Sequence, residues 1–245
     1  MRTATPLIAL AALVTLVATG CSVSLDGPII TASDLKGDSV TEARDVDGFA
    51  SIEMDGSADL VVTQGAEFEV LVTTDSGLVE HIGTKVVEGE LVVTQDYSVI
   101  GFSPDVTVSV TLPSLGAVEL NGSSNATVSD VTGDALSITV AGSADVSVDA
   151  AVDSLVVAIT GSGNVTAQGS AADLEVDISG SGDVDASALE SRTAHVEVAG
   201  SGNVSVDASE TLDVTISGSG DVLYAGTPRI TQAVSGSGGL QAEDR

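Results

Sequence analysis

The sequence predicts an all-β fold in which coils of 18 to 20 residues stack into a β-solenoid behind a less regular N-terminal lobe. A turn like Gly180-Ser181-Gly182-Asp183 recurs at that spacing, apolar and polar residues alternate on both sides of each copy, and only 2% of residues are aromatic. Regular copies begin at Gly122, Gly142, Gly161, Gly180, Gly200, Gly218 and Gly236, and an outlying copy begins at Gly56. A fixed period of this size is typical of folds whose units bury apolar residues by stacking.

The alternation with a period of two places every second residue of a strand on the inner face. Two inward columns result, one of Val118, Ile138, Val157, Val176, Val196 and Val214, the other of Leu120, Val140, Ile159, Ile178, Val198 and Ile216. Stacked at about 4.8 Å per coil, they form dry ladders that can supply most of the folding free energy. Such narrow coils leave little room for large rings, which fits the absence of tryptophan.

The fourth residues of successive turns alternate between asparagine and aspartate, as Asn125, Asp145, Asn164, Asp183, Asn203 and Asp221. Alternation keeps like charges two strand spacings apart and lets each asparagine amide donate to neighbouring carboxylates. We therefore interpret this column as a structural ladder of Asx side chains. Calcium held between the turns is the alternative, because Asp and Asn oxygens are suitable ligands for this ion.

The first 20 residues have the features of a secretory signal. Arg2 precedes an apolar run that is too short to span a bilayer comfortably, and small residues separate this run from Cys21. The sequence of residues 17–21, VATGC, resembles a bacterial lipobox, with Ala18 where leucine is usual. The resemblance implies cleavage before Cys21 and lipid attachment to it, whereas an ordinary signal followed by an unrelated cysteine is the alternative. Cys21 is the only cysteine, which excludes a disulfide within the chain.

Composition divides the rest of the chain. Residues 21–42 are rich in Ser, Thr, Gly and Asp, and we expect a flexible tether there. Residues 43–240 then form one domain, with an N-terminal lobe at 43–113 and regular coils at 114–240, followed by a tail at 241–245. The lobe contains the Gly56 copy, strand-like alternation, and one or two helical turns between Gly77 and Ile82. We expect it to be wider than the coils and to cap that end of the stack.

Several short motifs occur in a characteristic order. Arg44 to Phe49 has the sequence RDVDGF, Gly56 to Gly65 has GSADLVVTQG, Leu112 to Leu115 has LPSL, and the turn copies follow. In this order they resemble the head GIN domain family of auto-transporter adhesins over about residues 43–240. The resemblance implies a right-handed, single-stranded β-helix on a bacterial envelope protein, a role in adhesion, and no established catalytic residues.

The chain carries 36 acidic and 7 basic residues, a net charge of −29. Such a surface repels nucleic acid and anionic headgroups, which excludes nucleic acid as a ligand, and it attracts cations and basic partners. Contact with the membrane is then made through the lipid on Cys21. We expect a lipid-anchored, extracytoplasmic protein of the cell envelope, with a surface protein or a glycan as its ligand.

One outward column brings together residues that can bind a metal ion. Aligning the coils on their turns places Glu175, His195 and Asp213 next to one another at intervals of about 4.8 Å. Carboxylate, imidazole and carboxylate form a permissible ligand set for zinc or another divalent ion. A solvated acidic face that contains one histidine is the alternative. Apart from calcium or zinc at these two places, we expect no cofactor.

Three functions fit the sequence. The first is a non-catalytic adhesin that presents its flat acidic strand faces to a ligand, and the second is a structural or envelope-stress component without a ligand of its own. The third is a carbohydrate-active β-helix enzyme, although such enzymes use larger coils, long loops and aromatic sugar platforms. With only His81 and His195, the chain also has few candidate bases for a serine nucleophile. We therefore expect no enzymatic activity.

Overall fold

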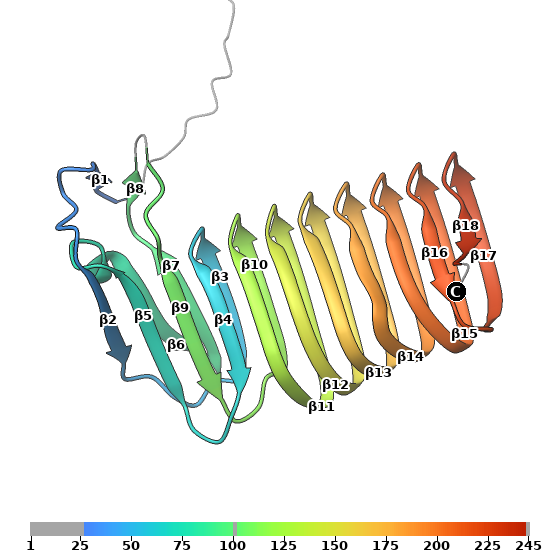
Figure 1. The fold of residues 1–245 in the computed structure, drawn as a ribbon, viewed down its shortest axis with the longest axis horizontal. Coiled ribbons are helices and arrows are strands. Elements are labelled where there is room, and N and C mark those ends of the chain that lie inside the picture. The colour runs from blue at the N-terminus through green and yellow to red at the C-terminus, as the bar shows by residue number, and fades with distance from the viewer. Residues whose placement is uncertain (1–26, 100–101, 244–245) are drawn as a thin grey trace, which may run out of the picture.

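The structure, a computed structural model, describes residues 27–99 and 102–243. These residues form a stack of β-strands, most of it a β-solenoid with about seven turns of about 19 residues (Figure 1). The all-β solenoid that the sequence predicts is therefore confirmed. The predicted signal and Cys21 lie outside the described residues. Within the described ranges, no helix has both the length and the apolar character needed to cross a membrane.

The strands are long in the regular coils and short in the N-terminal lobe. In chain order they are β1 (Ile29–Ile30), β2 (Ser39–Arg44), β3 (Ser51–Gly56), β4 (Asp59–Gln64), β5 (Glu69–Asp75), β6 (Ile82–Val87), β7 (Glu90–Gln95), β8 (Ser98–Val99), β9 (Thr107–Leu112), β10 (Ala117–Gly122), β11 (Asn125–Gly142), β12 (Asp145–Gly161), β13 (Asn164–Gly180), β14 (Val184–Gly200), β15 (Val204–Gly218), β16 (Val222–Ala225), β17 (Arg229–Gly236) and β18 (Leu240–Ala242). One 3₁₀ turn, η1 (Val79–His81), lies where the sequence predicts helical turns. Each strand from β11 to β15 follows most of one coil and ends at a turn glycine.

The glycine turns lie in one column. The first glycine of each copy pairs in register with that of the next, from Gly56 through Gly122 to Gly236. In each later turn the serine amide donates to the glycine carbonyl of the preceding coil, as Ser181 N does to Gly161 O at 2.8 Å. The outlying copy at Gly56 is therefore the first turn of the same stack, and a long insertion follows it in the sequence.

The predicted inward columns form the core. In β13, Val176 and Ile178 are buried, whereas Glu175 on the same strand is exposed. Val176 pairs with Val157 in the coil before it and with Val196 in the coil after it. Each inward side chain thus packs between two others of its column and loses its contact with water, which stabilises the stack by about 25 cal/mol per Å² of apolar surface.

Differences in coil length are absorbed at the bend opposite the glycine turns. The register between β14 and β15 shifts between Ala186 and Glu190, whereas the pairing that leads to the glycine turn is regular. A similar shift lies between Val128 and Val131 where β11 pairs with β12. Coils of 18 to 20 residues can therefore share one turn column and one core.

The N-terminal lobe continues the stack and then closes it. Strand β7 pairs parallel with β3, and β9 pairs parallel with β4, so the two sheets gain one more layer. Beyond this layer, β6 pairs antiparallel with β7, β5 with β9, and β2 with β5. The glycine turn column ends at this layer. The Ser57 amide donates to Gln95 Oε1 at 2.6 Å, whereas in later coils the serine amide donates to a glycine carbonyl.

The tether and tail boundaries differ from those predicted. Strand β2 begins at Ser39 and pairs with β5, and β1 pairs with β8, with Ile30 buried. The prediction of a flexible tether over residues 21–42 is therefore wrong for the residues that form β1 and β2. At the other end, β18 runs to Ala242, inside the tail predicted over residues 241–245. Strand β2 is mostly exposed on both sides, so its sequence lacks the alternation that would have revealed it.

Candidate functional site

One sheet of the solenoid presents carboxylates on its outer face. Strands β13, β14 and β15 pair so that Glu175, His195 and Asp213 lie in adjacent register positions, as the sequence predicts. Asp177 and Glu197 form a neighbouring pair two residues further along the same strands. These five side chains project outward from a core that fixes their backbone positions.

The His195 column borders a shallow hollow of about 360 Å³, which also includes Asp173 and Thr193. Asp173 Oδ1 accepts a hydrogen bond from Thr193 Oγ1 at 2.6 Å and lies 3.5 Å from Arg192 Nη2. His195 Nδ1 lies 3.9 Å from Asp213 Oδ2, and both side chains are about half exposed. The hollow is therefore acidic and open to solvent.

The column does not form a metal-ligand cluster in this structure. Across residues 27–99 and 102–243, no group of three or more His, Cys, Asp or Glu side chains is placed to hold a metal ion. Glu175, His195 and Asp213 share one face, but they do not gather around one point. The zinc site at these three residues therefore stays a prediction, as does the solvated acidic face.

A second acidic group lies on the same outer face, nearer the N-terminal lobe. Glu53 of β3 pairs in register with Glu119 of β10, and Asp55 and Glu90 lie nearby. Partial burial, followed by repulsion from Asp55, Glu119 and Glu90, raises the pKa of Glu53. This group is not among the predicted site residues, because Glu53 and Glu119 are separated by the insertion and become neighbours only when β3 stacks on β10.

We call these two groups together the acidic face. It consists of Glu53, Asp55, Glu90, Glu119, Glu175, Asp177, Glu197 and Asp213. The coils between the two groups present uncharged residues in the same columns, among them Ser137, Thr139 and Val156. The acidic face therefore has two negative patches on one sheet, separated by a neutral strip.

The Asx side chains of the turns are joined from coil to coil by hydrogen bonds. Asn164 Nδ2 donates to Asp145 Oδ1 at 2.8 Å, and Asn203 Nδ2 donates to Asp183 Oδ1 at 3.0 Å. Backbone amides also donate to Asx oxygens of the coil before, as Asp221 N does to Asn203 Oδ1 at 3.2 Å. Asp145, Asp183 and Asn203 thus each use one side-chain oxygen to accept a protein donor.

This ladder extends beyond the six predicted residues. Asn125 Nδ2 donates to Asp59 Oδ1 at 3.1 Å, and Gly239 N donates to Asp221 Oδ1 at 2.8 Å. Asn125 and Asp145 lie opposite each other in register. The ladder therefore follows the turn column from the outlying copy to the last coil.

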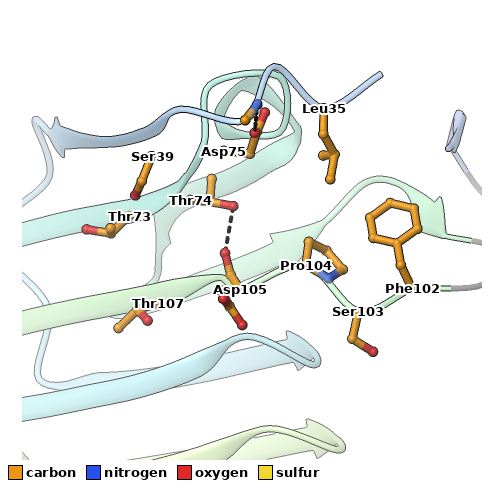
Figure 2. A pocket seen from close by; sticks show the side chains of 11 residues that line it. Leu35, Ser39, Thr73, Thr74, Asp75, Phe102, Ser103, Pro104, Asp105 and Thr107 are labelled. Atoms are coloured by element: carbon orange, nitrogen blue, oxygen red, sulfur yellow. Dashed lines mark hydrogen bonds between the residues drawn. The ribbon is translucent and has the colours of Figure 1, made fainter. Parts of the chain in front are cut away.

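A hollow of about 370 Å³ lies in the N-terminal lobe between β2, β5 and the segment before β9. Leu35, Phe102 and Pro104 provide its apolar wall (Figure 2). Thr74 Oγ1 closes one side by donating to Asp105 O at 2.9 Å. This hollow is not apparent from the sequence, because its walls come from three separate, non-periodic segments.

Asp75 holds the rim of this hollow in place. Its carboxylate accepts the backbone amides of Lys36 at 3.0 Å, Gly77 at 2.8 Å and Gly37 at 2.7 Å. These hydrogen bonds favour the ionised form and hold the pKa of Asp75 below its ordinary value. The segment before β2 is thus fastened to the end of β5.

Comparisons with known proteins agree with the fold described above. A crystal structure of a "putative adhesin" from Bacteroides fragilis superposes with a TM-score of 0.82 at 22% identity, covering 87% of this chain and 100% of the other. A "putative lipid binding protein" and a "putative adhesin" from Parabacteroides distasonis each superpose with a TM-score of 0.72 at 23% identity, covering 88% of this chain and 100% of theirs. At these identities the likeness establishes the fold alone.

Sequence comparison identifies the family. None of the curated protein sequences matches the chain. The profile described as "Putative auto-transporter adhesin, head GIN domain" matches residues 48–228, which include the outlying turn, the insertion and the regular coils up to β16. The chain therefore belongs to the head GIN domain family of auto-transporter adhesins.

Proposed function

We propose that this protein is a non-catalytic, lipid-anchored adhesin of the cell envelope that binds cationic groups of a surface protein or glycan through the acidic face. The observation that supports this proposal most directly is the register of Glu175, His195 and Asp213 beside Asp177 and Glu197 on one solvent-exposed sheet. The family description and the solved structures of similar fold supply the adhesin role as a hypothesis.

Rigidity makes this face suited to recognition. The strands that present the carboxylates are held by buried side chains on their inner side. Val176 and Val196 are buried and alternate along β13 and β14 with the residues that face outward. A partner therefore orders little of the backbone when it binds, which reduces the entropy cost of association. The net charge of −29 adds long-range attraction for a basic partner, strongest at low ionic strength.

Removing charge from this face is expected to weaken binding. We expect immobilised oligolysine peptides and amino-sugar oligomers to capture the protein, and the triple variant Glu175→Gln, Glu197→Gln, Asp213→Asn to bind at least about tenfold more weakly at low salt. The matched control is Asp153→Asn, Glu190→Gln, Glu210→Gln, which removes three exposed charges outside the acidic face. Affinity is measured by surface plasmon resonance at two salt concentrations.

The possible results separate the functions. Equal losses in the two triple variants would show that net charge alone is recognised, and capture by none of the probes would favour a structural component. Release of reducing ends from a polysaccharide panel would contradict the non-catalytic role. None of these measurements depends on the lipid anchor.

The anchor is tested through Cys21. Cells that express the chain and are fed labelled palmitate should incorporate the label into the wild type and not into Cys21→Ser, because the thiol is the expected attachment point. The variant should also lack lipoprotein-type cleavage before residue 21. An unlabelled wild type would show that the segment before Cys21 is an ordinary signal, and a variant that keeps the label would show that the lipid is attached to another residue.

A further inference from the structure

The C-terminal end of the stack has unpaired strand edges. Strand β17 pairs with β15 on one side and β18 pairs with β16, and within the described ranges no strand pairs with the other side of either. Figure 1 shows this end opposite the N-terminal lobe. Ile230 and Val234 of β17 are 38% and 43% exposed, although their partners Leu212 and Ile216 are buried. The edge is therefore a row of free backbone groups flanked by exposed apolar side chains.

Composition leaves this edge unprotected. Strand β17 has eight residues, and its only charge is Arg229 at the first position. Residues 222–242 contain no Asp or Glu in a chain of net charge −29, and Glu243 directly follows them at the end of β18. At the opposite end, the outer strands carry charges that discourage pairing, namely Lys85 in β6 and Glu42 and Arg44 in β2. Two such acidic molecules therefore meet with less repulsion at this end than at their acidic faces.

The pattern of β17 is self-complementary. Register with β15 assigns Ile230, Gln232 and Val234 to the inward side. A two-fold axis placed at Gln232 runs two copies of the strand antiparallel, which is the pairing that an isologous interface requires. Ile230 then lies opposite Val234 of the second copy, and the two Gln232 amides face each other and can exchange hydrogen bonds.

We propose that two copies of this chain associate end to end through β17, antiparallel about Gln232. The pairing gives hydrogen-bond partners to the free backbone groups of both edges and continues the apolar columns across the junction. It uses the same edge on both copies, so the assembly ends at a dimer. A head-to-tail arrangement would instead join unlike ends, including the charged edges of β2 and β6, and would continue as a filament.

The arrangement has a functional consequence, which rests on the proposed anchor. In the dimer the two N-terminal lobes lie at opposite extremes of one rod, because β17 lies at the end of the stack remote from the lobe (Figure 1). Two lipid anchors would then attach to two different membranes. The homophilic dimer would thereby join neighbouring cells or envelopes.

Sedimentation velocity tests the association without the anchor. We expect the chain carrying Cys21→Ser to show a concentration-dependent doubling of mass. Adding Val234→Lys should raise the dissociation constant at least about tenfold, because it places a charged side chain opposite Ile230 of the second copy. The matched control is Leu223→Lys, since Leu223 is 39% exposed but points outward from β16, which is paired on both sides. Circular dichroism checks that both variants are folded.

Disulfide formation tests the register. In the Cys21→Ser chain, Gln232→Cys places one thiol opposite its own copy at a separation that a disulfide can span, so mild oxidation should yield covalent dimers. Thr231→Cys, which lies away from the axis and on the outward side, should yield few. A monomer at all concentrations, equal effects of the two lysine variants, or ladders longer than dimers would overturn the proposal. These outcomes do not bear on binding by the acidic face, so the two proposals can fail separately.

Discussion

Replacing Ile178 by aspartate is expected to cost several kcal/mol of unfolding free energy, a large fraction of the roughly 5–15 kcal/mol of a typical domain. Ile178 is 1% exposed and packs in register between Ile159 and Val198. A carboxylate at this position would be buried without a partner, and the coil would have to open or take up a proton. Urea denaturation followed by circular dichroism measures the loss.

The control lies on the same strand. Glu175→Gln removes a charge from the outward side of β13 and leaves the core untouched, so its unfolding free energy should stay within about 0.5 kcal/mol of the wild type. Comparable destabilisation by the two substitutions would show that inward and outward positions of β13 have been exchanged.

Gly180→Ala is expected to be nearly as damaging, at about 3 kcal/mol or more. Gly180 has φ of +149°, a conformation that only glycine adopts readily, and an added Cβ would collide with the carbonyl of Gly161 in the coil before. That carbonyl accepts the Ser181 amide, and the Gly180 carbonyl accepts the Ser201 amide at 2.9 Å. The collision therefore disturbs the hydrogen bonds of two successive turns. Thermal unfolding monitored by circular dichroism quantifies the effect.

Gly133 provides the comparison that separates strain from collision. It has φ of +153°, close to that of Gly180, but no atom lies within 4 Å of the position its Cβ would take. Gly133→Ala should therefore show the backbone strain alone and destabilise the protein less than Gly180→Ala does. If both variants lose the same stability, close stacking of the turns contributes nothing to the requirement for glycine.

The regular coils could be predicted because one rule holds in each of them. A two-residue alternation decides which side chains face inward, and the recurrent turn fixes how one coil aligns with the next. Val157, Val176 and Val196 are therefore neighbours in the structure as they are in the predicted column. The Glu175, His195 and Asp213 neighbours follow from the same alignment, and only the exact placement of their side chains required the structure.

The lobe could not be predicted in the same way, because its contacts join segments with no common period. The hollow beside Phe102 depends on Asp75 holding the backbone at Lys36, nearly forty residues earlier in the chain. The turns carry one further pattern in the sequence, which is a small residue at the third position. This residue faces inward and is Ala144 in one coil but Gly163 in the next, where a Cβ would lie 2.7 Å from Val140 Cγ1. The third position is therefore restricted in size by the core.

The hydrogen bonds between successive turns run from coil to coil, so they lie along the length of the stack. When the two ends of the rod are pulled apart, the force acts perpendicular to the strands and along the hydrogen bonds between coils. The terminal coil can then separate while the other coils stay paired. Each coil of about 19 residues would release roughly 60 Å of chain as it straightens. The molecule would then lengthen in discrete steps under tension, and a contact made on the remaining coils would be spared part of the force.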